Sequence, residues 1–156
     1  MRLLVLAPGR PSHPGAVAWT EDLYGRIARI LPLERKSGRQ AKRGPGGLDL
    51  SAKSKESAAL IAMMPAGCHG VALDVGGQVM DSDRFAAWLI ATAETGCKHL
   101  CFLIGGPDGL DPAARSACRT TLSLGPMVLP HEMAEVVLAE QIYRALTRWK
   151  NLPYHR

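Results

Sequence analysis

Three short glycine-containing stretches combine residue types that could bind a small molecule. They are Leu73–Gly77, Ile104–Gly109 and Leu122–His131. Because glycine has no Cβ, a ligand can approach the backbone N–H and C=O groups of such loops. None of the three contains Lys or Arg, and neither glycine-rich phosphate-binding pattern follows a predicted strand. The loops therefore suit a ligand that is held by backbone hydrogen bonds and apolar contacts rather than by phosphates.

Each of these loops alone is weak evidence for a binding site. Gly105-Gly106-Pro107 is equally typical of a tight turn between a strand and a helix, and Pro130-His131 is equally typical of a helix start. What favours a site is that all three loops follow predicted strands of one sheet. In an open α/β sheet, ligands bind outside the carboxyl ends of the strands. We therefore expect the three loops to line one pocket.

Strands and helices are predicted to alternate along the chain, from short apolar runs and from apolar residues at helical spacing. The predicted strands are 3–7, 31–35, 71–75 and 100–104, and residues 122–129 are expected to contain a fifth strand that Gly125-Pro126 interrupts. The predicted helices are 16–31, 51–64 with Ser51 as N-cap, 83–95 with Ser82 as N-cap, a short helix after Asp111-Pro112, and 132–149 with Val136, Val137, Ala139, Ile142 or Tyr143, and Leu146 buried. This order predicts a single α/β domain over residues 1–156, with a mostly parallel sheet and helices on both faces.

Charge is unevenly distributed along the chain, whose net charge is +5. Residues 1–55 carry a balance of +7, residues 56–147 one of −5, and the last nine residues one of +3. A segment without apolar periodicity, which predicts a mobile loop, contains Arg35, Lys36, Arg39, Lys42 and Arg43. This distribution favours a polyanionic partner. A solvated surface without a partner is the alternative that charge alone leaves open.

Other features of the sequence exclude classes of protein. No apolar run approaches the roughly 20 residues that span a bilayer, and the N-terminal apolar run is too short for a signal peptide and is broken by Pro8. The four cysteines form neither a C-x-x-C pair nor a zinc-like pattern with nearby histidines. We therefore expect a cytoplasmic, reduced protein that binds no metal.

Several motifs occur in an order that resembles a known family. They are Leu103-Ile104-Gly105-Gly106-Pro107-Asp108-Gly109-Leu110, Leu122-Ser123-Leu124, Leu129-Pro130-His131, Glu140-Gln141-Ile142-Tyr143-Arg144-Ala145 and Pro153-Tyr154-His155-Arg156. In this order they are similar to the RlmH (YbeA) group of SPOUT methyltransferases. The similarity extends over the whole length; it is dense in the C-terminal half and thin between residues 8 and 60.

The resemblance implies a C-terminal trefoil knot in the α/β fold, a homodimer, and S-adenosylmethionine as methyl donor. The implied acceptor is N3 of a pseudouridine in 23S rRNA. Free RNA, the large subunit and the assembled ribosome all remain possible substrates. By position, the family's cofactor contacts fall on Leu73, Gly105, Gly106, Leu124, Gly125, Pro126, Met127, Val128 and Leu129. This agrees with the loops described above, because S-adenosylmethionine has no phosphates.

The resemblance also implies RNA contacts and a catalytic tail. Basic residues expected to contact RNA are Arg10, Arg35, Lys36, Arg39, Lys42, Arg43 and Arg144, of which Arg144 could instead pair with an acid. In the tail, His155 is expected to accept the N3 proton, since histidine titrates near neutral pH. Tyr154 is expected to stack on or hold the base, and Arg156 to bind a phosphate. From the residues alone, a frayed tail is the alternative.

The sequence departs from the family pattern at three places, one of which, Gly9-Arg10 in place of Gly-Lys, keeps the charge. The other two change the chemistry. Gly125-Pro126-Met127-Val128 stands where relatives often have Ser-x-Met-Thr, and Glu135 stands where they often have arginine. These departures favour one alternative function, a catalytically weakened RNA-binding protein with the same fold. A small-molecule binding protein of flavodoxin-like shape is a further alternative, against which the basic segments and the Tyr154-His155-Arg156 tail argue.

Overall fold

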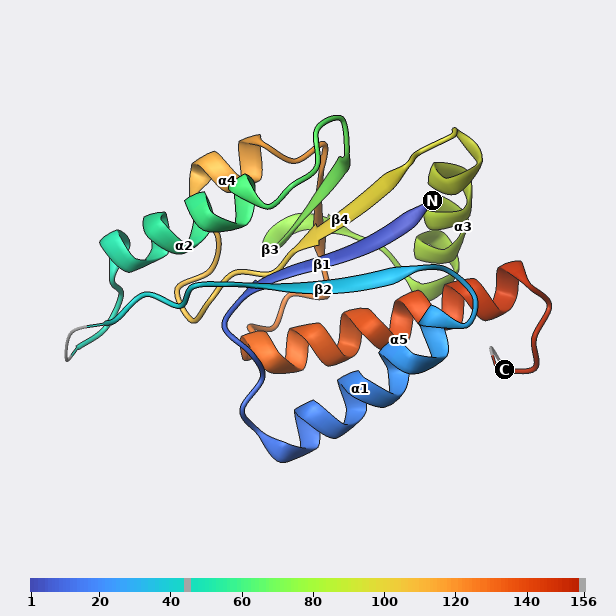
Figure 1. Cartoon of the computed structure of the whole chain (residues 1–156), viewed down its shortest axis with the longest axis horizontal. Coiled ribbons are helices and arrows are strands. Elements are labelled where there is room, and N and C mark those ends of the chain that lie inside the picture. Colours follow the sequence, from blue (N-terminus) through green and yellow to red (C-terminus); the bar gives the residue numbers. More distant parts are fainter. Residues whose placement is uncertain (44–45, 155–156) are drawn as a thin grey trace.

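The fold alternates strands and helices, as Figure 1 shows for a computed structural model that describes residues 1–43 and 46–154. The strands are β1 (Arg2–Pro8), β2 (Leu33–Gly38), β3 (His69–Val79), β4 (His99–Leu103) and β5 (Thr120–Ser123). The helices are α1 (Pro14–Ala28), α2 (Leu50–Ala62), α3 (Ser82–Glu94), α4 (Pro112–Ser116) and α5 (His131–Trp149). In the described ranges no helix has the length and apolar content needed to cross a membrane.

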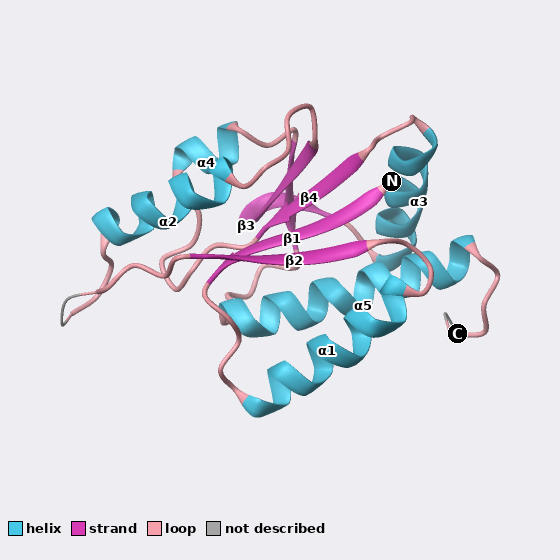
Figure 2. Ribbon diagram, viewed as in Figure 1, coloured by secondary structure: helices cyan, strands magenta, loops and turns pink. Residues whose placement is uncertain are grey.

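The strands form a five-stranded sheet in the order β2-β1-β4-β3-β5, and every pair of neighbours is parallel. Helices α1, α3 and α5 lie on one face of the sheet, and α2 and α4 lie on the other (Figure 2). Their buried side chains form two hydrophobic clusters, one on each face. The predicted α/β class, the parallel sheet and the helices on both faces are therefore confirmed.

The central strands β1 and β4 are apolar throughout because both of their faces are covered. Their register pairs Leu3 with Leu100 and Val5 with Phe102, and all four side chains lie in the core beneath α1, α3 and α5. The intervening Leu4 points to the opposite core. A strand that is buried on both faces reads as a continuous apolar run, which is why these two strands were predictable.

Two helices begin earlier than expected, because an aspartate rather than the predicted serine caps each of them. Asp49 accepts the Ala52 amide at 2.9 Å, and Asp81 accepts the Arg84 amide at 2.7 Å. Ser51 and Ser82 therefore lie inside helices α2 and α3. The cap predicted at Asp111 is confirmed, with the Ala114 amide at 2.8 Å. Aspartate and serine cap helices about equally well, so their order along the chain does not decide between them.

The strand predicted at 31–35 was placed too early, and the fifth strand lies before the interruption predicted at Gly125-Pro126. Strand β2 covers Leu33–Gly38, so Arg35 and Lys36 lie in the sheet rather than in a loop. Strand β5 ends at Ser123, because Gly125 adopts a φ of 136° and the following proline has no amide hydrogen to donate. Residues 124–130 are consequently a loop, which is free to line a ligand site.

The buried face of α5 also differs from the prediction, since Glu135 is buried whereas Val136 and Val137 are only half-buried. The Glu135 carboxylate accepts hydrogen bonds from Arg35 Nε at 2.6 Å and from the Tyr24 hydroxyl at 2.8 Å. Burial, followed by the charge of Glu135, raises the pKa of Tyr24 far above its usual range. This network joins α1, β2 and α5, and it accounts for Glu135 as a structural residue.

We predict that Glu135→Ala lowers the free energy of unfolding by about 3–5 kcal/mol, because it leaves Arg35 as a half-buried charge without its partner. Denaturant unfolding measures the loss. The triple variant Tyr24→Phe/Arg35→Met/Glu135→Met removes the whole network and should recover most of that stability. Equal losses in the single and triple variants would contradict this explanation.

Candidate functional site

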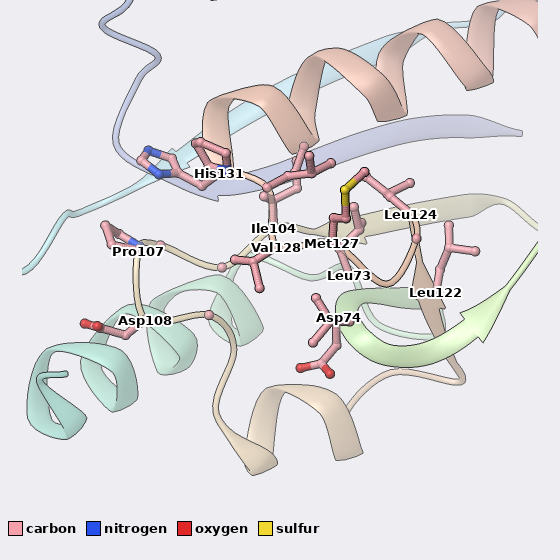
Figure 3. Close-up of a pocket in the computed structure, with 18 of the residues that line it drawn as sticks. Leu73, Asp74, Ile104, Pro107, Asp108, Leu122, Leu124, Met127, Val128 and His131 are labelled. Atoms are coloured by element: carbon pink, nitrogen blue, oxygen red, sulfur yellow. The ribbon is translucent and has the colours of Figure 1, made fainter. Parts of the chain in front are cut away.

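The loops after β4 and β5, together with the middle of β3, surround a cavity of about 760 Å³ (Figure 3). The strand predicted at 71–75 is longer than expected, so the stretch from Leu73 to Gly77 lies inside β3 rather than in a loop after it. The start of α5 closes one side with His131 and Ala134, and α2 and α4 contribute Lys53 and Arg115. All three glycine-containing stretches thus meet in one pocket, as expected. Of the predicted cofactor contacts, the cavity is lined by Leu73, Gly105, Gly106, Leu124, Gly125, Met127, Val128 and Leu129, and not by Pro126.

The loop after β4 is a closed turn that only glycine permits at its first position. The Gly109 amide donates to the Gly106 carbonyl at 2.8 Å, and the two residues form an isolated antiparallel bridge. A Cβ added to Gly105 would lie 2.4 Å from the Gly109 carbonyl carbon and 2.6 Å from the Leu110 nitrogen. The backbone of this loop therefore forms a wall of the pocket without side chains in front of it.

An irregularity in β3 brings Asp74 to the pocket. Strand β3 pairs with β5 at Leu73 and again at Gln78, so that residues 74–77 bulge out of the ladder. The Asp74 carboxylate accepts the Gly76 amide at 2.9 Å and pairs with Arg115 at 2.9 Å. Gly77 permits the return to the ladder, since a Cβ there would lie 2.7 Å from the Thr121 carbonyl carbon.

The ionised form of Asp74 is favoured by its neighbours. Burial acts to raise its pKa, but the Gly76 amide, the Arg115 guanidinium and the more distant Lys53 outweigh burial. The pKa of Asp74 is therefore lowered, and this carboxylate stays ionised at neutral pH.

The loop before α5 presents mostly apolar side chains to the pocket. Ser123 Oγ accepts the Gly125 amide at 3.2 Å and donates to the Gly125 carbonyl at 2.9 Å, which fixes the start of the loop. Further along, Met127 and Val128 are 77% and 84% exposed. Backbone groups, leucine and methionine side chains and a few charged groups can hold a compact ligand that combines an apolar ring with a cationic end.

The basic residues predicted to contact RNA fall into two sets. Arg10, Arg39 and Lys42 are exposed, and Lys36 is half-exposed with Glu34 at 3.6 Å. The other three are held by carboxylates of the same chain, in the pairs Arg35–Glu135 (2.6 Å), Arg43–Glu56 (2.7 Å) with Arg43–Asp108 (3.1 Å), and Arg144–Glu140 (2.6 Å). Only the first set presents exposed cations to a partner.

The part of the tail that the structure describes lies far from this chain's own pocket. The Tyr154 ring packs on Tyr143 at 4.5 Å between centroids, and the Arg144 guanidinium lies 5.5 Å from the Tyr154 ring. Tyr143 follows the pocket residue His131 by about 18 Å along α5, at 1.5 Å per residue. His155 and Arg156 lie outside the described residues.

Comparison with known proteins identifies the family. A family model described as "Predicted SPOUT methyltransferase" matches residues 1–155. The chain belongs to the SPOUT methyltransferase family. Among curated relatives, "Ribosomal RNA large subunit methyltransferase H" of Gemmatimonas aurantiaca is 42% identical, and the alignment covers 100% of both chains. The protein of the same name from Hyphomonas neptunium is 36% identical, over 100% of this chain and 99% of the relative.

The fold of this SPOUT methyltransferase is also similar to a solved structure. The match is "Crystal Structure of Probable Methyltransferase from Bordetella pertussis Tohama I", with a TM-score of 0.56 and 18% identity over 93% of this chain and 96% of the other. The predicted family and fold type are therefore confirmed, and the trefoil knot stays a prediction.

Some ion pairs around the pocket of the SPOUT methyltransferase could not be predicted from the sequence. Asp74 was visible as the polar residue at the end of a predicted strand, but its partner Arg115 lies 41 residues further along the chain. Glu56 and Asp108, which bind Arg43, give no local signal. In the described ranges no group of three or more His, Cys, Asp or Glu side chains is placed to hold a metal ion.

We predict that Gly105→Ala opens the closed turn and destabilises the protein by roughly 1–3 kcal/mol, as overpacking does. Thermal unfolding and hydrogen exchange at the Gly109 amide measure the two effects. The matched control is Gly25→Ala in α1, where a Cβ meets nothing within 4 Å, and it should stabilise by roughly 0.5–1 kcal/mol. A destabilised control, or a stable Gly105→Ala protein with protected Gly109, would contradict the argument.

We predict that Arg115→Gln raises the pKa of Asp74, because burial is then opposed by fewer favourable partners. In the native protein the pKa is lower than in the unfolded chain. Ionised Asp74 therefore stabilises the fold above pH about 4 and loses that effect as the pH falls through the native pKa. NMR titration of the Asp74 carboxyl carbon measures the shift. Arg119→Gln, which removes an exposed cation elsewhere, should leave the titration unchanged, and an unchanged titration in Arg115→Gln would refute the assignment.

Proposed function

We propose that this SPOUT methyltransferase transfers a methyl group from S-adenosylmethionine to N3 of a pseudouridine in 23S rRNA of the large ribosomal subunit, in the cytoplasm. The observation that carries the proposal is the full-length similarity to proteins named ribosomal RNA large subunit methyltransferase H. The pocket at the strand ends supports it, because its lining suits this cofactor.

The pocket residues fit S-adenosylmethionine on chemical grounds. The closed turn at Gly105–Gly109 leaves backbone groups accessible beside apolar side chains such as Leu73 and Leu124, which is the lining that an adenosine without phosphates needs. Asp74 adds a carboxylate at the cavity, and Lys53 and Arg115 add cations, so charges of both signs face a ligand that carries a sulfonium, an ammonium and a carboxylate group. Leu73, Gly105, Gly106 and the residues from Leu124 to Leu129 are therefore proposed as the cofactor site.

The chain's part in the reaction is to align the acceptor and to remove its proton. When bound, S-adenosylmethionine supplies an electrophilic methyl group on its sulfonium. The protein holds N3 of the base in line with that methyl group, and such positioning can supply much of the rate. His155 accepts the N3 proton, Tyr154 contacts the base and Arg156 binds a phosphate. The surrounding RNA is bound by the exposed basic residues Arg10, Lys36, Arg39 and Lys42.

We propose a homodimer in which the tail of one chain serves the pocket of its partner. Tyr154 packs near the far end of α5, whereas His131 at the start of α5 lines the pocket. A chain's tail therefore lies away from its own pocket. Apolar side chains beside the pocket, Met127, Val128 and Met133, are 77%, 84% and 48% exposed, and a second copy would cover them.

The alternative of a catalytically weakened RNA-binding protein loses one of its two supports. Glu135 is buried against Arg35 and Tyr24 and does not line the pocket. Its difference from relatives therefore concerns packing. Val128 is 84% exposed, so a missing hydroxyl there leaves the backbone of the loop in place.

The function is tested by transfer of a labelled methyl group to ribosomes from a strain that lacks the modification. We expect label at N3 of one pseudouridine, and parallel assays with free 23S rRNA, large subunits and assembled ribosomes identify the form that is methylated. Gly105→Ala serves as the impaired control. Binding of S-adenosylmethionine without label in any of the three substrates would favour the RNA-binding alternative.

We predict that deleting Tyr154–Arg156 abolishes methylation while folding and cofactor binding remain. Mixing the truncated protein with Gly105→Ala then shows whether the tail acts on the pocket of its own chain or on that of the partner. A mixed dimer contains one intact pocket and one intact tail on different chains, so activity should return if the tail serves its partner. Wild-type turnover by the truncated protein alone would refute the tail's role, and a mixture that stays inactive despite exchange of subunits would refute its action on the partner.

A further inference from the structure

A buried glutamate lies beneath the pocket loop, outside the cofactor site described above. Glu56 on α2 is only 2% exposed, and both of its carboxylate oxygens have partners. One accepts the Ala41 amide at 3.0 Å, and the other accepts Arg43 at 2.7 Å. A buried carboxylate with this set of partners fixes Ala41 and Arg43, which follow β2.

The Arg43 guanidinium connects this glutamate to the pocket loop. Its Nε donates to Asp108 at 3.1 Å, while its terminal nitrogen binds Glu56. Gly106 lies directly on the pair, since a Cβ added there would be 2.5 Å from Glu56 Oε2 and 3.1 Å from the Arg43 nitrogen. The loop that forms the cofactor wall thus rests on Arg43 and Glu56.

The same geometry argues against Arg43 as a phosphate contact. Its side chain is 21% exposed, and two of its nitrogens already face carboxylates. Two carboxylates around one guanidinium leave the cluster with a net charge of −1, which repels a phosphate. Arg39 and Lys42, in the same segment, are exposed instead.

We propose that Arg43 is a positioning residue that holds the Gly105–Gly109 turn in the shape that binds the cofactor, acting through Asp108 and Gly106. The identity of the ligand rests on the proposed function, whereas the effect of Arg43 on the turn does not depend on it. An arginine is required, because its planar fork can bind two carboxylates in fixed directions, whereas the ammonium of lysine is a single point charge.

The direct test is hydrogen exchange at the Gly109 amide of the ligand-free full chain. We expect at least tenfold faster exchange in Arg43→Gln and in Arg43→Lys than in the wild type. Lys55→Gln, an exposed neighbour of Glu56 on α2, is the matched control and should exchange as the wild type does. If Arg43→Gln fails to fold, Asp108→Asn provides the test, since it weakens the contact between Arg43 and the loop but leaves the Arg43–Glu56 pair in place. Wild-type exchange in the variants that fold would overturn the proposal.

The second arm measures binding of S-adenosylmethionine by calorimetry. We expect at least tenfold weaker binding by Arg43→Gln, and non-additive losses when Arg43→Gln and Asp108→Asn are combined, because the two residues act through one contact. Unchanged exchange and affinity, together with a fall of about one in the slope of log Kd for 23S rRNA against log salt, would show a phosphate contact and overturn the proposal. Absence of binding by the wild type would instead overturn the proposed function, while the exchange result would still decide the role of Arg43.

Discussion

The parallel direction of β3, β4 and β5 is the constraint on which the pocket depends. Because these strands run the same way, their carboxyl ends meet at one edge of the sheet. Segments that are separated along the sequence, namely the bulge of β3 after Leu73 and the loops after Leu103 and Ser123, are thereby brought around one cavity. Close approach of these segments in turn requires Gly77 and Gly105, where a Cβ would lie within 2.8 Å of neighbouring backbone atoms.

Buried carboxylates reduce the positive charge that the basic N-terminal region exposes. Counted along the sequence, residues 1–55 carry an excess of seven positive charges. In the fold, Glu135 and Glu56 each hold one of those arginines inside the molecule, where it joins secondary-structure elements. The exposed positive charge of residues 1–55 is therefore smaller and more localised than the sequence suggests, and it belongs to side chains such as Arg10, Arg39 and Lys42.

The parts of the fold that could be predicted from the sequence are those set by local patterns. Strands β1 and β4 were visible as apolar runs because both of their faces are buried, and the segments that line the pocket were visible as glycine-containing stretches. The extent of β5 and the pairing of Arg35, Arg43 and Arg115 were not visible. Arg35 meets Glu135 across 100 residues and Arg43 meets Asp108 across 65, and no local pattern reports which of many carboxylates a given arginine will find.

The central claim is that the pocket at the strand ends binds S-adenosylmethionine without help from phosphate recognition. Calorimetric titration of the wild-type protein with S-adenosylmethionine, alongside a titration with ATP, tests it most directly. We expect saturable binding of S-adenosylmethionine and weaker binding of ATP, because the glycine-containing stretches supply no Lys or Arg and the two cations at the cavity, Lys53 and Arg115, interact with Asp74. Binding of ATP in preference to S-adenosylmethionine, or no binding of S-adenosylmethionine at all, would contradict the account.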